Sequence, residues 1–225
     1  MIGDSPHIVR GGIIDPKRLF YSNVETALIL PVTIPPGYGI IPAGSVMGRI
    51  LTGTRAGQFV PVTQRVPATG LTTMFGAAYL LADGDANAVA QVLMEDSYKF
   101  AVGDLGFAID GNTAAGVDLG AVTAIDRTTT AHFATVTFTN NITNVITVAQ
   151  GGVVAVQTQA ISDWQTAAGI LIGGVDTGVG PDAAGGQGAM VVSNAVLYAG
   201  CLYNCDAGAI AELGAVASGQ YLIMR

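Results

Sequence analysis

Hydrophobic and polar positions alternate along the chain after residue 100 in a way that predicts β-strands. In the segment "HFATVTFT", Phe133 and Thr135 fall on one face of a strand. Ala134, Val136 and Phe138 fall on the other face, because successive side chains of a strand point to opposite sides. Three further segments resemble it and are separated by turn-forming residues: "FAVGDLGFAID", "LGAVTAID" and "NVITVAQGGVVAV". Short, evenly spaced strands of this kind are typical of a small barrel or sandwich.

Earlier in the chain, residues 41–63 predict a β-hairpin. The segment "IPAGSVMGRILTGTRAGQFVPV" is apolar, turns near Gly53 and Gly57, and then becomes apolar again. It contains no His, Cys, Asp or Glu, which are the residues that most often carry acid–base or metal chemistry. We therefore expect this hairpin to act through packing and strand pairing.

Helical patterns are few. Residues 75–100 leave a helix and a strand pair equally open, because apolar residues recur at helical spacing around Val89 and Val92 while Gly84 breaks the run. A short helix is predicted in "DAGAIAELGAVA", with Asp206 as its N-cap and its end near Gly219. The chain closes on the expected strand "QYLIMR".

These patterns together predict a mainly β fold with minor α. Residues 1–40 are expected to form an extended arm or a segment along a sheet edge, because prolines fix φ and remove ladder hydrogen bonds. Domain boundaries are expected on either side of the central β region, so that residues 65–162 are separate from residues 41–64 and 163–225.

Composition narrows the functional classes. The chain of 225 residues is 50% hydrophobic and only 11% charged, which is less than half the usual share of about 25% in soluble domains. Low charge in a β-rich chain indicates surface that another molecule covers. The net charge of −7, with Lys17 and Lys99 as its two lysines, argues against nucleic-acid binding. The start of the chain lacks the pattern of a signal peptide, and "TALILPVTIPP" is too short to span a membrane.

The short motifs that resemble active sites fail when their spacing is tested. "GDS" at residues 3–5 has no preceding strand and no suitable His–Asp pair for an esterase. The calcium-loop-like run from Asp83 has Ala88 at the place that needs glycine and Met94 at the place that needs glutamate. The loop "GGVDTGVGPDAAGGQG" lacks the Lys and the Ser or Thr of a phosphate-binding loop. We therefore predict no catalytic, cofactor-binding or metal site, and the protein is expected not to be an enzyme.

The two cysteines give no metal site either. Cys201 and Cys205, in "CLYNC", have no further Cys and no nearby His to complete a zinc site. We expect two small thiols that fill the core, because free Cys is among the most buried residue types.

Two blocks of the sequence resemble the lambda-type head decoration proteins of tailed phages. The first block is the run Gly44–Ile50, "GSVMGRI", followed by the strand Phe59, Val60 and Pro61. The second block begins with "AGIL" at residues 168–171. It continues through Val175, Asp176 and "AMVVSNAVLYAG" to Ala209–Leu213 and Tyr221–Met224. The resemblance covers residues 40–63 and 165–225. Family members join these blocks by a short stretch, so residues 65–162 are interpreted as an inserted barrel- or sandwich-like β subdomain.

The resemblance implies a capsid-stabilising protein without a cofactor. Such a protein binds the outer surface of the expanded capsid as a homotrimer and clamps neighbouring major capsid proteins. It is made in the host cytoplasm and ends in the virion. The family uses its N-terminal arm for capsid binding, which implies a capsid-binding role here for His7, Ile8, Val9, Arg10, Ile13 and Ile14.

Another virion structural protein, such as a tail-tube, fibre or minor capsid component, is the main alternative. It shares the composition but assembles as a ring or a long fibre. A carbohydrate-binding β protein is a further alternative, although Tyr79, Tyr98 and Trp164 are too scattered in the sequence to favour it.

Overall fold

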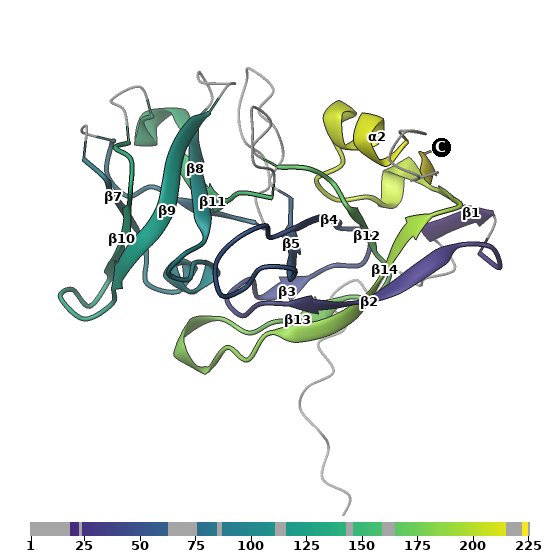
Figure 1. The fold of residues 1–225 in the computed structure, drawn as a ribbon, viewed down its shortest axis with the longest axis horizontal. Helices are drawn as coiled ribbons and strands as arrows, with labels where there is room; N and C mark the ends of the chain where they lie inside the picture. The colour runs from purple at the N-terminus through teal and green to yellow at the C-terminus, as the bar shows by residue number, and fades with distance from the viewer. Residues whose placement is uncertain are drawn as a thin grey trace, which may run out of the picture.

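A computed structural model describes residues 19–22, 24–62, 76–84, 87–110, 116–142, 146–158, 165–214 and 222–224. The fold is mainly β with minor α, as predicted, and one of its sheets curls into a half-barrel. Figure 1 shows the curled sheet on the left, with the remaining sheets and helix α2 towards the right.

The first large sheet has five antiparallel strands in the order β2-β14-β12-β4-β5. Their bounds are β2 (Leu28–Ile34), β14 (Gly186–Ser193), β12 (Gly169–Leu171), β4 (Val46–Arg49) and β5 (Phe59–Pro61). A separate two-stranded ribbon joins β3 (Ile40–Ile41) to β13 (Val175–Asp176). The predicted hairpin of residues 41–63 is confirmed, because β4 pairs with β5 through Gly48 and Val60.

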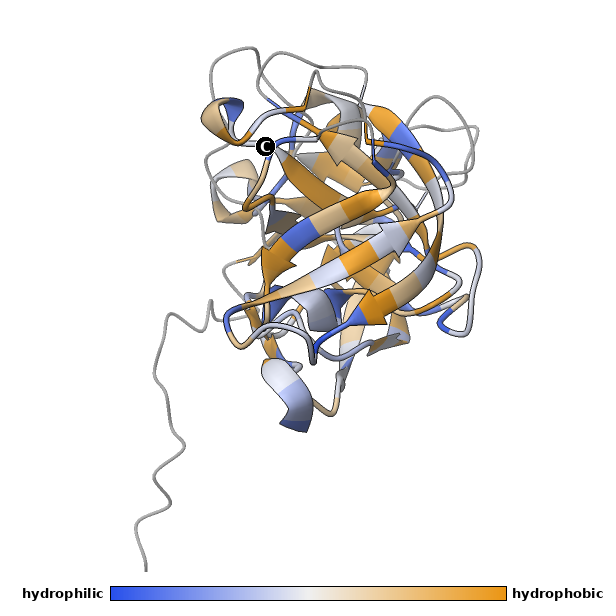
Figure 2. Ribbon diagram, turned by 90° about the vertical axis from the view of Figure 1, so that its left-hand side faces the viewer, coloured by the Kyte–Doolittle hydropathy of each residue, from blue (hydrophilic) through white to orange (hydrophobic). Residues whose placement is uncertain are grey.

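The second large sheet is the curled one and has six antiparallel strands in the order β6-β11-β8-β9-β10-β7. Their bounds are β6 (Ala77–Tyr79), β11 (Val153–Val156), β8 (Leu105–Ile109), β9 (Val117–Asp126), β10 (Phe133–Phe138) and β7 (Val89–Leu93). The curl brings the two edge strands together, so that the Leu81 N–H donates to the Gln91 carbonyl. Hydrophobic and hydrophilic residues alternate along the strands that face the viewer in Figure 2.

A smaller sheet and the helix complete the fold. The sheet contains β1 (Phe20–Ser22), β15 (Ala195–Leu197) and β16 (Leu222–Met224), and its β15–β16 pair is parallel. Helix α2 (Ala207–Leu213) starts as predicted, because the Asp206 side chain accepts a hydrogen bond from the Ala209 N–H. The described residues also form the short 3-10 helices η1 (Asp96–Lys99), η2 (Val148–Gln150), η3 (Gly180–Asp182) and η4 (Ala199–Cys201).

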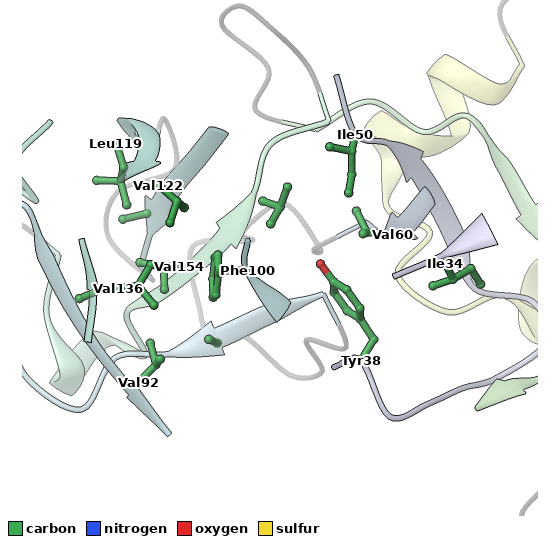
Figure 3. Packing of buried hydrophobic residues seen from close by; sticks show 14 of the residues in the cluster. Ile34, Tyr38, Ile50, Val60, Val92, Phe100, Leu119, Val122, Val136 and Val154 are labelled. Carbon is green, nitrogen blue, oxygen red and sulfur yellow. The ribbon is translucent and has the colours of Figure 1, made fainter. Parts of the chain in front are cut away.

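The five-stranded sheet is the middle layer of the molecule, because both of its faces are buried. Alternate residues of its strands belong to two different hydrophobic clusters. Met47, Leu171 and Met190 join the cluster shared with the six-stranded sheet. Their strand neighbours Val46, Ile170 and Val191 join a cluster with the three-stranded sheet and α2. The large core between the two main sheets is drawn in Figure 3.

The structure decides two alternatives that the sequence left open. Residues 75–100 contain the strands β6 and β7, so the strand alternative is confirmed there and the helical one is wrong. Within the proline-rich segment 1–40, residues 28–34 form the edge strand β2, which matches the sheet-edge alternative. Residues 20–22 and 40–41 also enter strands, and residues 1–18 and 23 lie outside the described structure.

Candidate functional site

The most distinctive surface feature of the described structure is the first half of the edge strand β2. The side chains of Leu28, Ile29 and Leu30 are 49%, 43% and 42% exposed, and Pro31 is exposed as well. We call these four residues the β2 surface. Further along the same strand, Val32 and Ile34 are buried in the large core. The strand therefore enters the core at one end and leaves apolar side chains in solvent at the other.

Side chains of β14 are buried, whereas those of the adjacent β2 surface are exposed. Ile29 lies opposite Val191, and Leu30 lies opposite Met190. Both β14 residues are fully buried, one in each of the two clusters that cover the sheet. The neighbouring β2 residues are exposed on both faces, because adjacent residues of a strand point to opposite sides. Along the first half of β2, the layers that cover the middle sheet therefore end at β14, one strand before the edge.

Aromatic side chains lie near the start of β2. The rings of Tyr21 and Tyr198 meet edge to face, with 5.2 Å between their centroids. They are held together by the pairing of β1 with β15 and by a 3.0 Å hydrogen bond from the Tyr198 N–H to the Leu19 carbonyl. Both tyrosines and Val24 in the following turn are exposed. Exposed apolar and aromatic side chains are therefore found both at β1 and β15 and on the first half of β2.

A charged cluster is buried where the two large sheets meet. The Asp104 carboxylate, fully buried, accepts hydrogen bonds from the Arg55 guanidinium and, at 2.7 Å, from the Ala101 N–H. The Lys99 carbonyl accepts from Arg55 Nη2 at 2.7 Å and from the Tyr38 hydroxyl at 3.0 Å. We call Tyr38, Arg55, Lys99 and Asp104 the buried latch.

The groups of the latch bind one another across the sheet junction. Tyr38 and Arg55 belong to the side of the five-stranded sheet, whereas Lys99 and Asp104 belong to the side of the six-stranded sheet. In Figure 3, Tyr38 lies between Ile34 and Val60 on one side and Phe100 on the other. Burial raises the pKa of Tyr38 to about 12. The hydroxyl therefore keeps its proton near neutral pH, and Tyr38 is not a candidate general base. The latch is a structural connection, and sequence reasoning missed it because its residues are far apart in the chain.

The motifs that the sequence analysis rejected show no assembled chemistry where they are described. The Asp83 carboxylate accepts a 2.7 Å hydrogen bond from the Val148 N–H, which connects Asp83 to the start of η2. Among the described residues, no group of three or more His, Cys, Asp or Glu could hold a metal ion. Cys201 and Cys205 are free thiols that pack against the second cluster, but they are only partly buried and do not fill the core as expected. Burial, followed by the charge of Asp206, raises the pKa of Cys205 to about 11.

The predicted capsid-binding residues lie outside the described structure. They are His7, Ile8, Val9, Arg10, Ile13 and Ile14. Their role stays a prediction.

Comparison of the chain with family models, curated proteins and solved structures finds no match. The part of the chain that the structure describes contains no helix with the length and apolar character needed to cross a membrane.

Proposed function

We propose that this chain is a head decoration protein of a tailed phage. In this role it binds the outer surface of the expanded capsid as a homotrimer and stabilises the lattice of major capsid proteins. It acts by binding and carries out no catalysis, so no cofactor is required.

One observation carries the proposal. The two sequence blocks that resemble decoration proteins are separated by residues 64–164, yet they supply neighbouring strands of a single sheet. β4 and β5 come from the first block, and β12 and β14 come from the second. Gly169 of the second block pairs directly with Met47 of the first. This pairing supports the proposal, because the resemblance requires both blocks to belong to one sheet.

The surface of the protein agrees with a role in lattice binding. A decoration protein needs exposed pairing surface, since strand addition gains affinity from main-chain hydrogen bonds and apolar side chains. The β2 surface offers both. Modest affinity at each site is sufficient in a trimer, because linked contacts multiply the overall binding strength.

The test is a pelleting experiment with expanded heads of the phage that encodes this chain, stripped of their own decoration protein. The full chain should pellet with the heads, and electron cryo-microscopy should show density on local three-fold axes of the outer surface. Density confined to a tail would favour the other virion structural proteins instead. A chain that remains in the supernatant at saturating concentration would contradict the proposal.

A further inference from the structure

We propose that the outer edge of β2 accepts an added β-strand, and that the occupant is an extended, uncharged, apolar segment of the major capsid protein. This inference rests on the proposed function and names how and where the partner binds. It concerns the β2 surface and is independent of the predicted role of residues 7–14.

The direction of the main-chain groups follows from Pro31. Proline has no N–H, so within a sheet it occupies edge strands with its nitrogen facing away from the neighbouring strand. Pro31 lies within the β2–β14 ladder, opposite Ala189. Its nitrogen must therefore face the open side. Residues two apart in an antiparallel strand direct their main-chain groups to the same side, so the N–H and carbonyl of Ile29 face outward as well.

These groups face the side of β2 that has no ladder partner among the described strands. β2 ends the sheet order, and among the described strands its only ladder partner is β14. A segment lying antiparallel along β2 could exchange two hydrogen bonds with Ile29 and donate one to the Pro31 carbonyl. The missing N–H of Pro31 limits full pairing to the stretch before it.

The exposed side chains favour a strand over a flat surface as the occupant. Leu30 points to the same face as the buried Val32, whereas Ile29 and Pro31 point to the opposite face. A flat partner would cover one of these faces and leave the other in water. An added strand has side chains on both faces of the sheet, so it would cover Leu30 on one face and Ile29 and Pro31 on the other.

The charge pattern defines the chemistry of the occupant. The sequence has no charged residue from Thr26 to Gly48, and β14 has none either. A charged side chain buried here would lose water without gaining an opposite charge. The occupant is therefore uncharged where it lies on β2, with apolar residues at neighbouring positions.

The experiment compares Ile29→Pro with Ile29→Ala in the full chain, using the stripped expanded heads described above. Both substitutions remove the isoleucine side chain, but only Ile29→Pro removes the outward N–H. Ile29→Pro should bind heads at least about tenfold more weakly than Ile29→Ala, because it loses a hydrogen bond and its ring obstructs the added strand. Equal binding of the two variants would overturn the inference.

A measurement without mutation covers the case in which Ile29→Pro fails to fold. Amide hydrogen exchange of the wild-type chain should show a fast-exchanging Ile29 amide in the free protein and a protected one on heads. No change at Ile29 on heads would overturn the inference while leaving the proposed function intact. Protection that is already present in the free protein and disappears on dilution would show that a second copy is the occupant. A wild-type chain that does not bind heads would overturn the proposed function, and this inference with it.

Discussion

At the scale of single residues, the junction between the two large sheets depends on a buried ion pair. Arg55 and Asp104 are 49 positions apart in the chain, and their side chains are 9% and 0% exposed. A buried pair of this kind adds little compared with an apolar pair of the same shape, but removal of one partner leaves an uncompensated charge in the core. The cost of breaking the pair should therefore be much larger than the benefit of forming it.

We predict that Arg55→Met lowers the free energy of unfolding by about 3–5 kcal/mol, because Asp104 then keeps its charge in the core without a cation. The double variant Arg55→Met/Asp104→Leu should recover most of this loss. Arg49→Met, at an exposed position of the same hairpin, should change the stability by less than about 0.5 kcal/mol. Urea denaturation of the four proteins measures these differences. A double variant no more stable than the single one would contradict the explanation.

Because of Tyr38, the free energy of unfolding should depend on pH in the alkaline range. Burial raises the pKa of Tyr38 in the folded protein from 10.0 to about 12, so the folded state holds the phenolic proton more tightly than the unfolded state. The stabilisation is complete below pH 10 and is lost as the pH rises towards 12. Two pKa units correspond to about 2–3 kcal/mol.

We therefore expect the stability of the wild-type chain to fall more steeply between pH 10 and pH 12 than that of Tyr38→Phe. The phenylalanine variant should be less stable below pH 10, because it lacks the hydrogen bond to the Lys99 carbonyl. Urea midpoints at half-unit pH steps provide the comparison. Parallel pH profiles of the two proteins would show that Tyr38 does not cause the alkaline loss.

At the scale of elements, local patterns predicted the strands that are buried on one side. The strand β10 alternates between partly buried and buried residues as the sequence "HFATVTFT" indicates. Helix α2 begins where Asp206 indicates, but its last residue is Leu213, and Gly214 follows as the C-cap. The expected end near Gly219 was too late because glycine is a poor helix former.

Elements whose environment is set by distant residues could not be predicted in this way. Val89 and Val92 repeat at helical spacing, yet β7 forms because it pairs with β10 and so enters the curled sheet. The prolines of residues 1–40 left an arm and a sheet-edge segment open, because a proline is compatible with both, and the structure places Pro31 in the edge strand β2. The β2 surface became visible only once the burial of Met190 and Val191 on the next strand was known.

Two turns from different sheets meet at glycines, and this contact should be sensitive to a single methyl group. Gly53, in the turn between β4 and β5, has a φ of 82°, and a Cβ there would lie 2.7 Å from the Gly103 carbonyl carbon. Gly57 in the same turn has a φ of 87°, but a Cβ there would meet only the end of the Arg49 side chain, at 3.7 Å.

A comparison of Gly53→Ala with Gly57→Ala therefore separates the cost of a Cβ pressed against the neighbouring turn from the cost of a positive φ. Both variants carry the cost of a positive φ, about 1–2 kcal/mol. Gly53→Ala should lose about 1–3 kcal/mol more, because backbone atoms of the neighbouring turn must move. Thermal and urea denaturation give the difference. Equal stabilities would mean that the two turns can separate without cost.

At the scale of the whole molecule, the central β region and the rest of the chain share one core. The six-stranded sheet takes all of its strands from residues 77–156, in agreement with a contiguous segment of the sequence. Its inward side chains, such as Val136 and Val154, nevertheless belong to the same cluster as Met47, Leu171 and Met190 of the five-stranded sheet. A segment that is continuous in the sequence is thus not independent in its packing.

This shared core makes a prediction about removal of the central region. If residues 65–162 were a separate subdomain, a chain lacking residues 66–160 would fold and still bind heads. The structure predicts the opposite, because deletion would expose one whole face of the middle sheet, including Leu171 and Met190. The latch would also lose Lys99 and Asp104, so that Arg55 would remain without its carboxylate.

The shortened chain should aggregate or bind a hydrophobic dye, and it should show no cooperative unfolding transition. A second shortened chain with Leu171→Thr and Met190→Gln provides the control, because it carries the same deletion with a less apolar exposed face. Improved solubility of this control would identify the uncovered face as the cause of failure. A shortened chain that is soluble, unfolds cooperatively and binds heads at full occupancy would instead establish an independent core. The six-stranded sheet would then be an addition that the rest of the protein does not need for folding.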